Sequence, residues 1–291
     1  MSDKDKDLTN LLDSWPYGDG PSIRKISGVD GREKIQVRVC IDSFHGILQF
    51  ESDGRPDGAR PHSREFLLDH LEDKYRKHME KGGVPEQYRL THSQCKKIFE
   101  ESQMLYHRYV ILLQIGDYPR VVRDTTRNMR LFRFVHEHAL QLEDRNHLEC
   151  WWPYILRIHH TAMAMQNLGE GGLEKALEEL TLCRKRLKAL EPQDNETFQT
   201  ELERSTEALD QMEKELLALK PESPVDKLEK EKLAAIAAER YEEAARLRDK
   251  ISDMKAHPEA YKDTEEASED AAESSDEPAE PSAPEDGEEQ S

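Results

Sequence analysis

Several common signatures of enzymes are missing from this sequence. The glycine-rich patterns Gly-x-Gly-x-x-Gly and Gly-x-x-x-x-Gly-Lys-Ser/Thr, which bind nucleotides, do not occur in its 291 residues, and neither does the hydrolase pattern Gly-x-Ser-x-Gly. No apolar run is long enough to cross a membrane, and the Asp- and Lys-rich N-terminus is unlike a signal peptide. We therefore expect a cytoplasmic protein that is not an enzyme and that needs no cofactor.

Cysteine is scarce, and none of the four cysteines belongs to a Cys-x-x-Cys pair. They stand 55, 55 and 33 residues apart, at Cys40, Cys95, Cys150 and Cys183. A structural zinc ribbon needs such pairs and is excluded, whereas reduced thiols fit a cytoplasmic protein. The histidine pairs His136-x-His138 and His159-His160 are poor metal faces, because rings this close in sequence point in different directions on a helix. We expect these histidines at the edges of the core and no metal site.

Acidic residues are concentrated in the last part of the sequence. From Glu259 to Ser291 there are 14 Asp and Glu against the single Lys262, so this segment carries −13 of the total net charge of −19. Aliphatic and aromatic residues nearly vanish after Tyr261, and such a segment cannot bury enough surface to offset the entropy lost on ordering. We predict a disordered acidic tail over residues 257–291, which keeps the protein soluble, with the attraction of basic partners or mimicry of DNA as alternatives.

Strand patterns occur only near the start of the sequence. A polar arm over residues 1–22 is predicted to be flexible. Apolar and polar residues then alternate over 35–41, which is typical of a half-buried strand, and apolar residues on both sides indicate two neighbouring strands. A helical pattern follows over 63–82 and ends at a glycine pair. We predict a small antiparallel sheet plus one helix over residues 23–83.

Paired helices are predicted over residues 91–220. Gly116 and Gly169 each follow an apolar residue between two helical stretches, and both turns resemble the inter-helix turn of tetratricopeptide repeats. They lie 53 residues apart, which is longer than that repeat, so we expect long and degenerate hairpins. Stacks of such hairpins generally bind peptides or pack against themselves.

The last helix of this region, over residues 195–219, has apolar residues in heptad-like steps from Phe198 to Leu219, broken only by Ser205. Such a helix either covers the end of the helical body or pairs with a second copy of the chain. The pattern is short for an independent coiled coil, so we expect it to cover the body.

A row of arginines is the strongest indication of nucleic-acid binding in the sequence. These residues recur every three or four positions and share one helical face: Arg120, Arg123, Arg127, Arg130 and Arg133. The acidic body and tail would compete with phosphate or repel it. We therefore expect this arginine stripe to pair with neighbouring carboxylates, with an anionic ligand or the protein's own tail as alternatives, and we do not expect direct nucleic-acid binding.

Residues 225–256 have the composition of a short helical hairpin. Pro221 and Pro224 exclude a helix upstream, Pro258 ends the segment, and nearly all residues between are strong helix formers. Apolar residues occupy one half of each predicted helix. Two short helices cannot bury both apolar stripes completely against each other. We therefore expect an apolar surface that is left for a partner.

This segment also contains an ordered pattern of residue types. An apolar residue is followed eight positions later by an aromatic residue and Glu, then by Ala-Ala, an aliphatic residue, Arg-Asp and a final aliphatic residue. The residues in these places are Leu233, Tyr241, Glu242, Ala244, Ala245, Leu247, Arg248, Asp249 and Ile251. The pattern resembles the UVR motif, a helical hairpin at the end of the repair helicase UvrB and within the repair nuclease UvrC. Tyr241 stands where Phe is commoner, and Ile236 stands where a small residue is usual.

The resemblance implies protein–protein contact through these residues and through Ile236, and it brings no catalytic group. Arg248 and Asp249 would orient the partner, with Arg248 either extended into water or ion-paired to a facing carboxylate. The implied partner is UvrB-like or UvrC-like, which connects the protein to nucleotide excision repair. The motif also occurs in Clp-associated proteins and in McsA-type adaptors, so a Clp-type ATPase is the alternative, although this chain lacks the Cys-x-x-Cys zinc sites of McsA-type adaptors. Association of the hairpin with a second copy of this chain is a further alternative.

The predicted fold is mainly α, of the α+β type. It comprises a small antiparallel sheet, a body of helical hairpins, the 225–256 hairpin and the acidic tail. The predicted function is that of an adaptor that binds other proteins.

Overall fold

The computed structural model describes residues 8–16, 18, 22–42, 44–220 and 224–257. They belong to two compact units, which divide between Ala218 and Leu219. The fold is mainly helical with one small sheet, as the sequence predicts. Apart from His257, the predicted acidic tail lies outside the described residues. Within the described part of the chain, no helix is both long and apolar enough to cross a membrane.

The sheet has three antiparallel strands in sequence order: β1 (Ile23–Ser27), β2 (Glu33–Ile41) and β3 (Phe44–Glu51). The alternation over 35–41 correctly predicts the central strand. Ile35, near the start of β2, is fully buried and packs in an apolar cluster with Tyr109 and Leu112 of the helical body. Lys25 of β1 also forms an ion pair of 2.5 Å with Asp117. One end of the sheet is therefore anchored to the helices.

The described part of the predicted flexible arm contains a short helix, α1 (Thr9–Asp13). Trp15 follows it and lies against the sheet. The guanidinium of Arg24 is 4.1 Å from the centroid of the Trp15 ring, and Arg38 Nε donates to the Trp15 carbonyl oxygen at 2.9 Å. Both arginines stand on the same face of the sheet, so this part of the arm covers that face.

After the sheet, a long loop leads to α2 (Leu67–Glu80). The helix begins four residues later than the start of the predicted 63–82 pattern, and the chain leaves it through Gly82, whose φ of +81° favours glycine. The buried carboxylate of Glu101 accepts hydrogen bonds from the Leu67 and Leu68 backbone N–H groups, at 2.8 and 3.1 Å. A side chain from the next helix in the sequence thus satisfies the first turn of α2.

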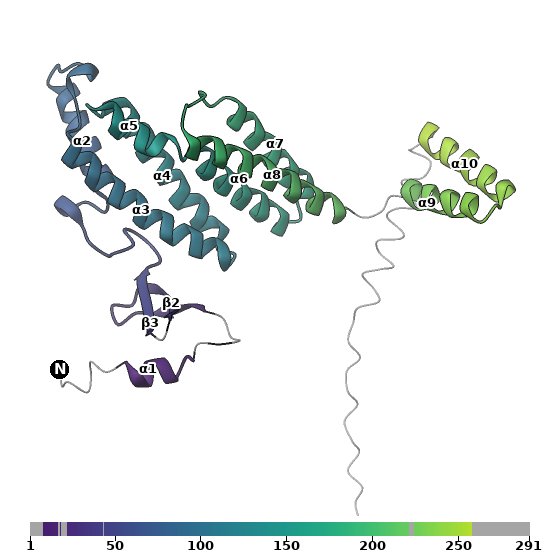
Figure 1. Cartoon of the computed structure of the whole chain (residues 1–291), viewed down its shortest axis with the longest axis horizontal. Coiled ribbons are helices and arrows are strands. Elements are labelled where there is room, and N and C mark those ends of the chain that lie inside the picture. Colours follow the sequence, from purple (N-terminus) through teal and green to yellow (C-terminus); the bar gives the residue numbers. More distant parts are fainter. Residues whose placement is uncertain (1–7, 17, 19–21, 43, 221–223, 258–291) are drawn as a thin grey trace, which may run out of the picture. The chain divides into compact units, whose positions relative to one another are not determined.

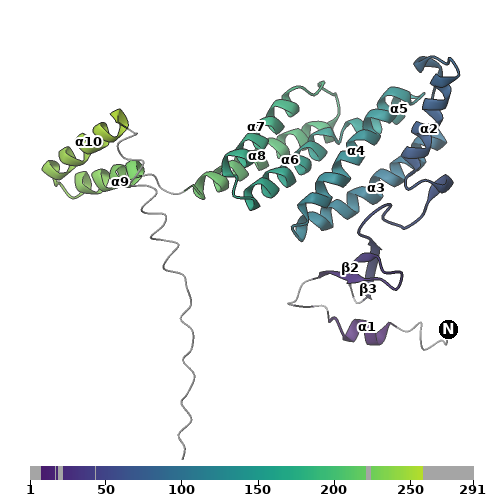
Figure 2. The same cartoon turned by 180° about the vertical axis from the view of Figure 1, so that it is seen from behind.

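Six helices form the body: α3 (His92–Gln114), α4 (Tyr118–His138), α5 (Leu142–Glu149), α6 (Trp152–Gly169), α7 (Leu173–Lys188) and α8 (Glu196–Ala218). Figures 1 and 2 show them side by side, with the sheet at one end of the α3–α4 hairpin. The two predicted turns are present, and the chain reverses through Gly116 and Gly171, which have φ of +70° and +78°. A continuous apolar core, including Ile98, Leu131 and Leu180, joins these helices.

Helix α8 covers the end of the body, as expected from its heptad-like pattern. It packs against α6 and α7, and Phe198, Leu209 and Leu216 are buried there. Ser205, which interrupts the apolar pattern, is also fully buried. Its hydroxyl donates to the Pro153 carbonyl oxygen at 3.1 Å. The hydroxyl oxygen also accepts a hydrogen bond from Arg157 Nε at 3.2 Å. The buried hydroxyl thus has the partners that a buried polar group needs.

The arginine stripe on α4 is paired with carboxylates, as predicted. Arg120 forms two hydrogen bonds of 3.0 Å with Asp53 in the loop after β3, and Arg123 pairs with the same carboxylate. Arg127 and Arg130 both pair with Asp69 of α2, at 3.1 and 3.3 Å. The last arginine, Arg133, has its guanidinium 5.7 Å from the centroid of the Trp152 ring. The stripe therefore joins α4 to the loop and to α2, and most of its charge is compensated within the body.

Another arginine, Arg108, is buried behind this stripe together with Asp124. The two form a bidentate pair, with Nε and one Nη of Arg108 at 2.7 and 2.9 Å from the carboxylate oxygens. The remaining Nη donates to the carbonyl oxygens of Glu51 and Gly54, at 3.0 and 2.7 Å. One buried cation thus connects α3, α4 and the loop that follows the sheet.

Three of the four cysteines are buried and Cys40 is half-buried, and all four are free thiols. His138, His159 and His160 are buried as well. Nδ1 of His159 lies 2.9 Å from the Thr125 hydroxyl, and Nδ1 of His160 lies 2.9 Å from the Glu179 carboxylate. Three of the four predicted histidines are therefore buried, whereas His136 is exposed and its Nδ1 lies 3.0 Å from the Glu149 carboxylate.

Candidate interaction surface

The second compact unit contains two antiparallel helices, α9 (Pro224–Ala237) and α10 (Tyr241–Ala256). The connection between them is short. Glu239 adopts a φ of +59°, and its N–H donates to the Ile236 carbonyl oxygen at 3.0 Å. The Arg240 N–H then donates to the Ala235 carbonyl oxygen at 2.8 Å, which closes the end of α9.

The two helices are held together by a small apolar interface. Ala235 of α9 and Ala244, Ile251 and Met254 of α10 are buried. Ala235 precedes the connection and Ala244 follows it by a similar number of residues. Their small side chains allow the backbones of α9 and α10 to approach closely at this level. A salt bridge of 2.8 Å between Lys255 and Glu229 closes the other end of the hairpin, and this hydrogen bond lowers the pKa of Glu229.

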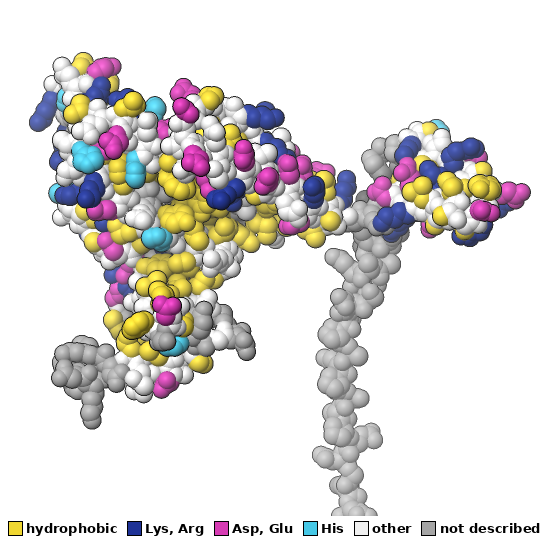
Figure 3. Space-filling model, viewed as in Figure 1, with side chains coloured by type: hydrophobic (Ala, Val, Ile, Leu, Met, Phe, Trp, Pro, Cys, Tyr) yellow, Lys and Arg dark blue, Asp and Glu magenta, His cyan; other side chains and the backbone are white. Residues whose placement is uncertain are grey.

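Three large apolar side chains remain exposed beside the connection. The exposed fraction is 62% for Leu233, 45% for Ile236 and 66% for Tyr241. Leu233 and Ile236 are three residues apart and so share one side of α9, while Tyr241 begins α10 directly after the turn. Figure 3 shows apolar side chains gathered on the visible face of this hairpin. We call Leu233, Ile236 and Tyr241 the turn-end patch.

The structure divides the other candidate residues into two groups. Ala244 and Ile251 face α9 and are buried, and Ala245 and Leu247 are half-buried. Glu242, Arg248 and Asp249 are exposed. Arg248 pairs with its sequence neighbour Asp249 at 2.7 Å instead of with a carboxylate of α9. Within the predicted set, therefore, some residues hold the hairpin together and others are free to meet a partner.

The hairpin has no excess of either charge. Residues 224–257 contain eight Asp and Glu and eight Lys and Arg, distributed over both helices. A basic surface is the electrostatic requirement for binding nucleic acid, and residues 224–257 carry no net positive charge. The feature that distinguishes its surface is the apolar turn-end patch.

Residues 222–256 match the family model of the UvrB/uvrC motif. The match spans both helices of the hairpin, which is hereafter the UVR hairpin. The UVR motif is a protein-interaction module, so the match supports a role in protein contact or a connection to the UvrABC system at the level of the motif. No curated protein and no solved structure gives a significant match to the chain. The likeness of the helical body to tetratricopeptide hairpins is accordingly not confirmed.

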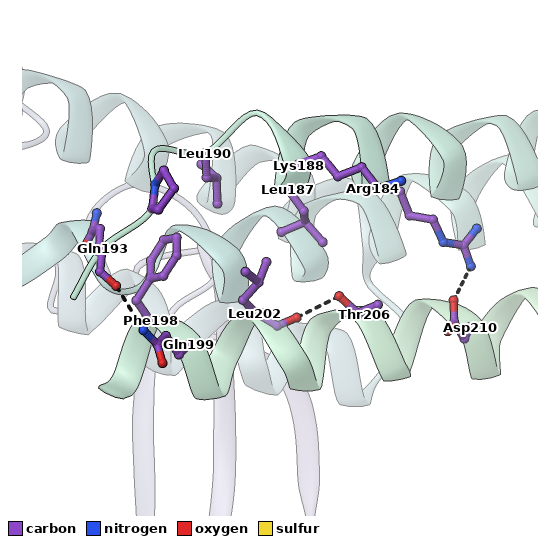
Figure 4. Close-up of a pocket in the computed structure, with 11 residues that line it drawn as sticks. Arg184, Leu187, Lys188, Leu190, Gln193, Phe198, Gln199, Leu202, Thr206 and Asp210 are labelled. Carbon is purple, nitrogen blue, oxygen red and sulfur yellow. Dashed lines mark hydrogen bonds and ion pairs between the residues drawn. The ribbon is translucent and has the colours of Figure 1, made fainter. Parts of the chain in front are cut away.

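The helical body has a recess that the sequence did not predict. A hollow of about 660 Å³ lies between the end of α7 and the start of α8 (Figure 4). Its apolar lining is formed by Leu187, Leu190, Pro192, Phe198 and Leu202. At one end, Arg184 joins the two helices through Asp210 at 2.8 Å and Glu213 at 2.9 Å. Nothing in the spacing of these residues indicates a hollow, because the hollow depends on how far α7 and α8 diverge at their connection.

Proposed function

We propose that this protein is a non-enzymatic adaptor and that it binds another protein through the turn-end patch of its UVR hairpin. The proposal rests on the exposure of Leu233, Ile236 and Tyr241. The interface between α9 and α10 is made by other residues. A partner can therefore cover the patch without opening the hairpin. The free cysteines fit a cytoplasmic protein. The patch has no charged side chain, which fits the binding of a protein surface and not of a charged ligand.

The partner most consistent with the motif match is the hairpin of a UvrB-like or UvrC-like protein, which would place the adaptor in nucleotide excision repair. The alternatives are a Clp-type ATPase and a second copy of this chain. Because the patch has no charged group, we expect each of these three partners to contact it through an apolar helical surface. The flanking Glu242, Arg248 and Asp249 are exposed and available to fix the orientation of the partner.

The turn-end patch is large enough to contribute measurably to affinity. Burying a Leu, Ile or Phe-sized side chain completely contributes about 1.5–3 kcal/mol, and roughly half or more of each patch side chain is still exposed. Each residue therefore has about 1–2 kcal/mol to gain on binding. Replacing one of them with a charged residue removes this gain and also places an unpaired charge in the contact.

The experiment compares full-length wild type with Leu233→Arg and Tyr241→Arg. Purified UvrB, UvrC and a Clp ATPase are each titrated by calorimetry or biolayer interferometry. Ser252→Arg serves as the matched control, because it adds the same charge at an exposed position of α10 near the opposite end of the hairpin. We expect both patch variants to lose at least tenfold in affinity for one of these proteins and the control to bind like wild type.

Circular dichroism shows whether the variants keep their helices, which they should, because both replaced side chains are mainly exposed. Binding that is equal in all four proteins would refute the patch as the contact surface. Absence of binding to all three candidates would refute the proposed partners.

A further inference from the structure

The hollow between α7 and α8 lies at the end of the helical body. In the body, α3 pairs with α4 and α6 pairs with α7, whereas α8 is the last described helix before the chain enters the second unit. Four lining residues of α8 recur every four positions and share one side of that helix: Phe198, Leu202, Thr206 and Asp210. This side is distinct from the side that buries Leu209 in the body.

The floor of the hollow is apolar and elongated. Figure 4 shows Leu187 of α7 pointing toward α8, where Phe198 and Leu202 contribute to the same floor. The ion pair between Arg184 and Asp210 closes one end. From Phe198 to Asp210 the lining of α8 extends over about 18 Å, at a rise of 1.5 Å per residue. A long apolar floor between two helices is the kind of groove that binds the apolar side of another helix.

The two edges of the hollow carry opposite charges. Lys188 lines the hollow on the α7 side, and Lys185 is three residues before it on the same side of that helix. On the α8 side, Glu203 and Glu207 each directly follow a lining residue. All four residues are exposed, and none of them has an ion-pair partner within the described part of the chain. A basic edge and an acidic edge are therefore both available to a ligand.

We propose that this hollow binds an amphipathic helix of another protein. The bound helix places its apolar stripe on the floor, its acidic side chains along the α7 edge and its basic side chains along the α8 edge. The charges select the partner, because a helix of a single charge would meet a like charge at one of the two edges. They also fix its direction, since a reversed helix would bring its acidic side chains to Glu203 and Glu207.

A helix in this position would give α8 a neighbour on the side that faces the hollow. The body would then end on a pair of helices, as its two earlier hairpins do. The hollow contains none of the residues of the turn-end patch, so this inference does not depend on the function proposed for the UVR hairpin.

Fluorescence anisotropy with the full chain and two labelled synthetic helical peptides tests the proposal. The peptides have the same apolar stripe. The mixed peptide has Glu along one edge and Lys along the other, whereas the acidic peptide has Glu along both edges. We expect wild type to bind the mixed peptide about tenfold more tightly, because the acidic peptide brings like charges to the α8 edge.

Reversing the charge of one edge separates this effect from the net charge of the chain. Glu203→Lys combined with Glu207→Lys makes both edges basic, so this variant should prefer the acidic peptide. The matched control is Glu174→Lys combined with Glu178→Lys, which makes the same change of net charge at exposed residues near the start of α7, away from the hollow. The control should keep the wild-type preference for the mixed peptide.

Filling the hollow should also abolish binding. Thr206 lines the hollow and is exposed, so Thr206→Arg occupies the space without replacing a core residue. Ala208→Arg is its control, since it adds the same charge at an exposed position of α8 that does not line the hollow. We expect the mixed peptide to bind Ala208→Arg like wild type and to lose affinity about tenfold or more for Thr206→Arg, with circular dichroism unchanged in both.

Three results would overturn the proposal. The first is a wild-type chain that does not bind the mixed peptide. The second is equal binding of that peptide to wild type and Thr206→Arg. The third is a control pair, Glu174→Lys with Glu178→Lys, that shifts the peptide preference as much as the change at the α8 edge does.

Discussion

Lowering the pH should destabilise the body through the buried His159. This ring lies between α4 and α6, with Nδ1 2.9 Å from the Thr125 hydroxyl. Burial lowers its pKa to about 4, and the nearby His160 and Arg186 act in the same direction. In the unfolded chain the same imidazole has a pKa near its ordinary value of 6.5.

The direction of the effect follows from which state binds the proton. Above pH 6.5 the imidazole is neutral in both states, so the full stability is present. Between pH 6.5 and 4 the unfolded chain takes up a proton that the folded protein excludes, and the free energy of unfolding falls by about 1.4 kcal/mol per pH unit. His159 alone should therefore cost about 2 kcal/mol at pH 5. Burial also lowers the pKa of His138 and of His160, which act in the same direction.

Urea unfolding at pH 7 and pH 5, followed by circular dichroism, measures this loss for wild type and for His159→Gln. Glutamine does not titrate, whereas all carboxylates are common to both proteins, so their contributions cancel in the comparison. Wild type should lose about 2 kcal/mol more than the variant between the two pH values. An equal loss in both proteins would refute the assignment of His159 as a buried, neutral imidazole.

Two further predictions concern the charges of the body. Asp124→Asn should destabilise the protein by about 3–5 kcal/mol, because it leaves the buried guanidinium of Arg108 without its carboxylate, and a midpoint in urea unchanged from wild type would contradict this. Removing residues 259–291 should leave the melting temperature unchanged at moderate ionic strength, because Arg120, Arg123, Arg127 and Arg130 already have carboxylate partners within the body. A lower melting temperature in calorimetry would instead show that the tail contributes to the fold.

Local patterns in the sequence predicted several elements of the secondary structure, although they did not predict α1. The alternation over 35–41 predicts β2, since the pleat of a strand has a period of two residues. Gly82 and Gly116 mark chain reversals because both adopt positive φ. The UVR hairpin is also a local feature, as its helix formers, its short connection and its ordered motif all lie within 35 consecutive residues. These features depend on neighbours in the sequence and need no knowledge of the rest of the chain.

Only the tertiary structure determines which segments pack against each face of a helix or strand. Periodicity places Tyr241 and Ile251 on the same half of α10, yet α9 buries Ile251 and leaves Tyr241 in water. The arginine stripe is visible in the sequence, but its partner Asp53 is 67 residues from Arg120. The alternating pattern runs along the whole of β2, yet Ile35 is buried against the helices and Ile41 is 68% exposed. A residue pattern specifies a face, whereas the packing of distant segments determines whether that face becomes core, ion pair or binding surface.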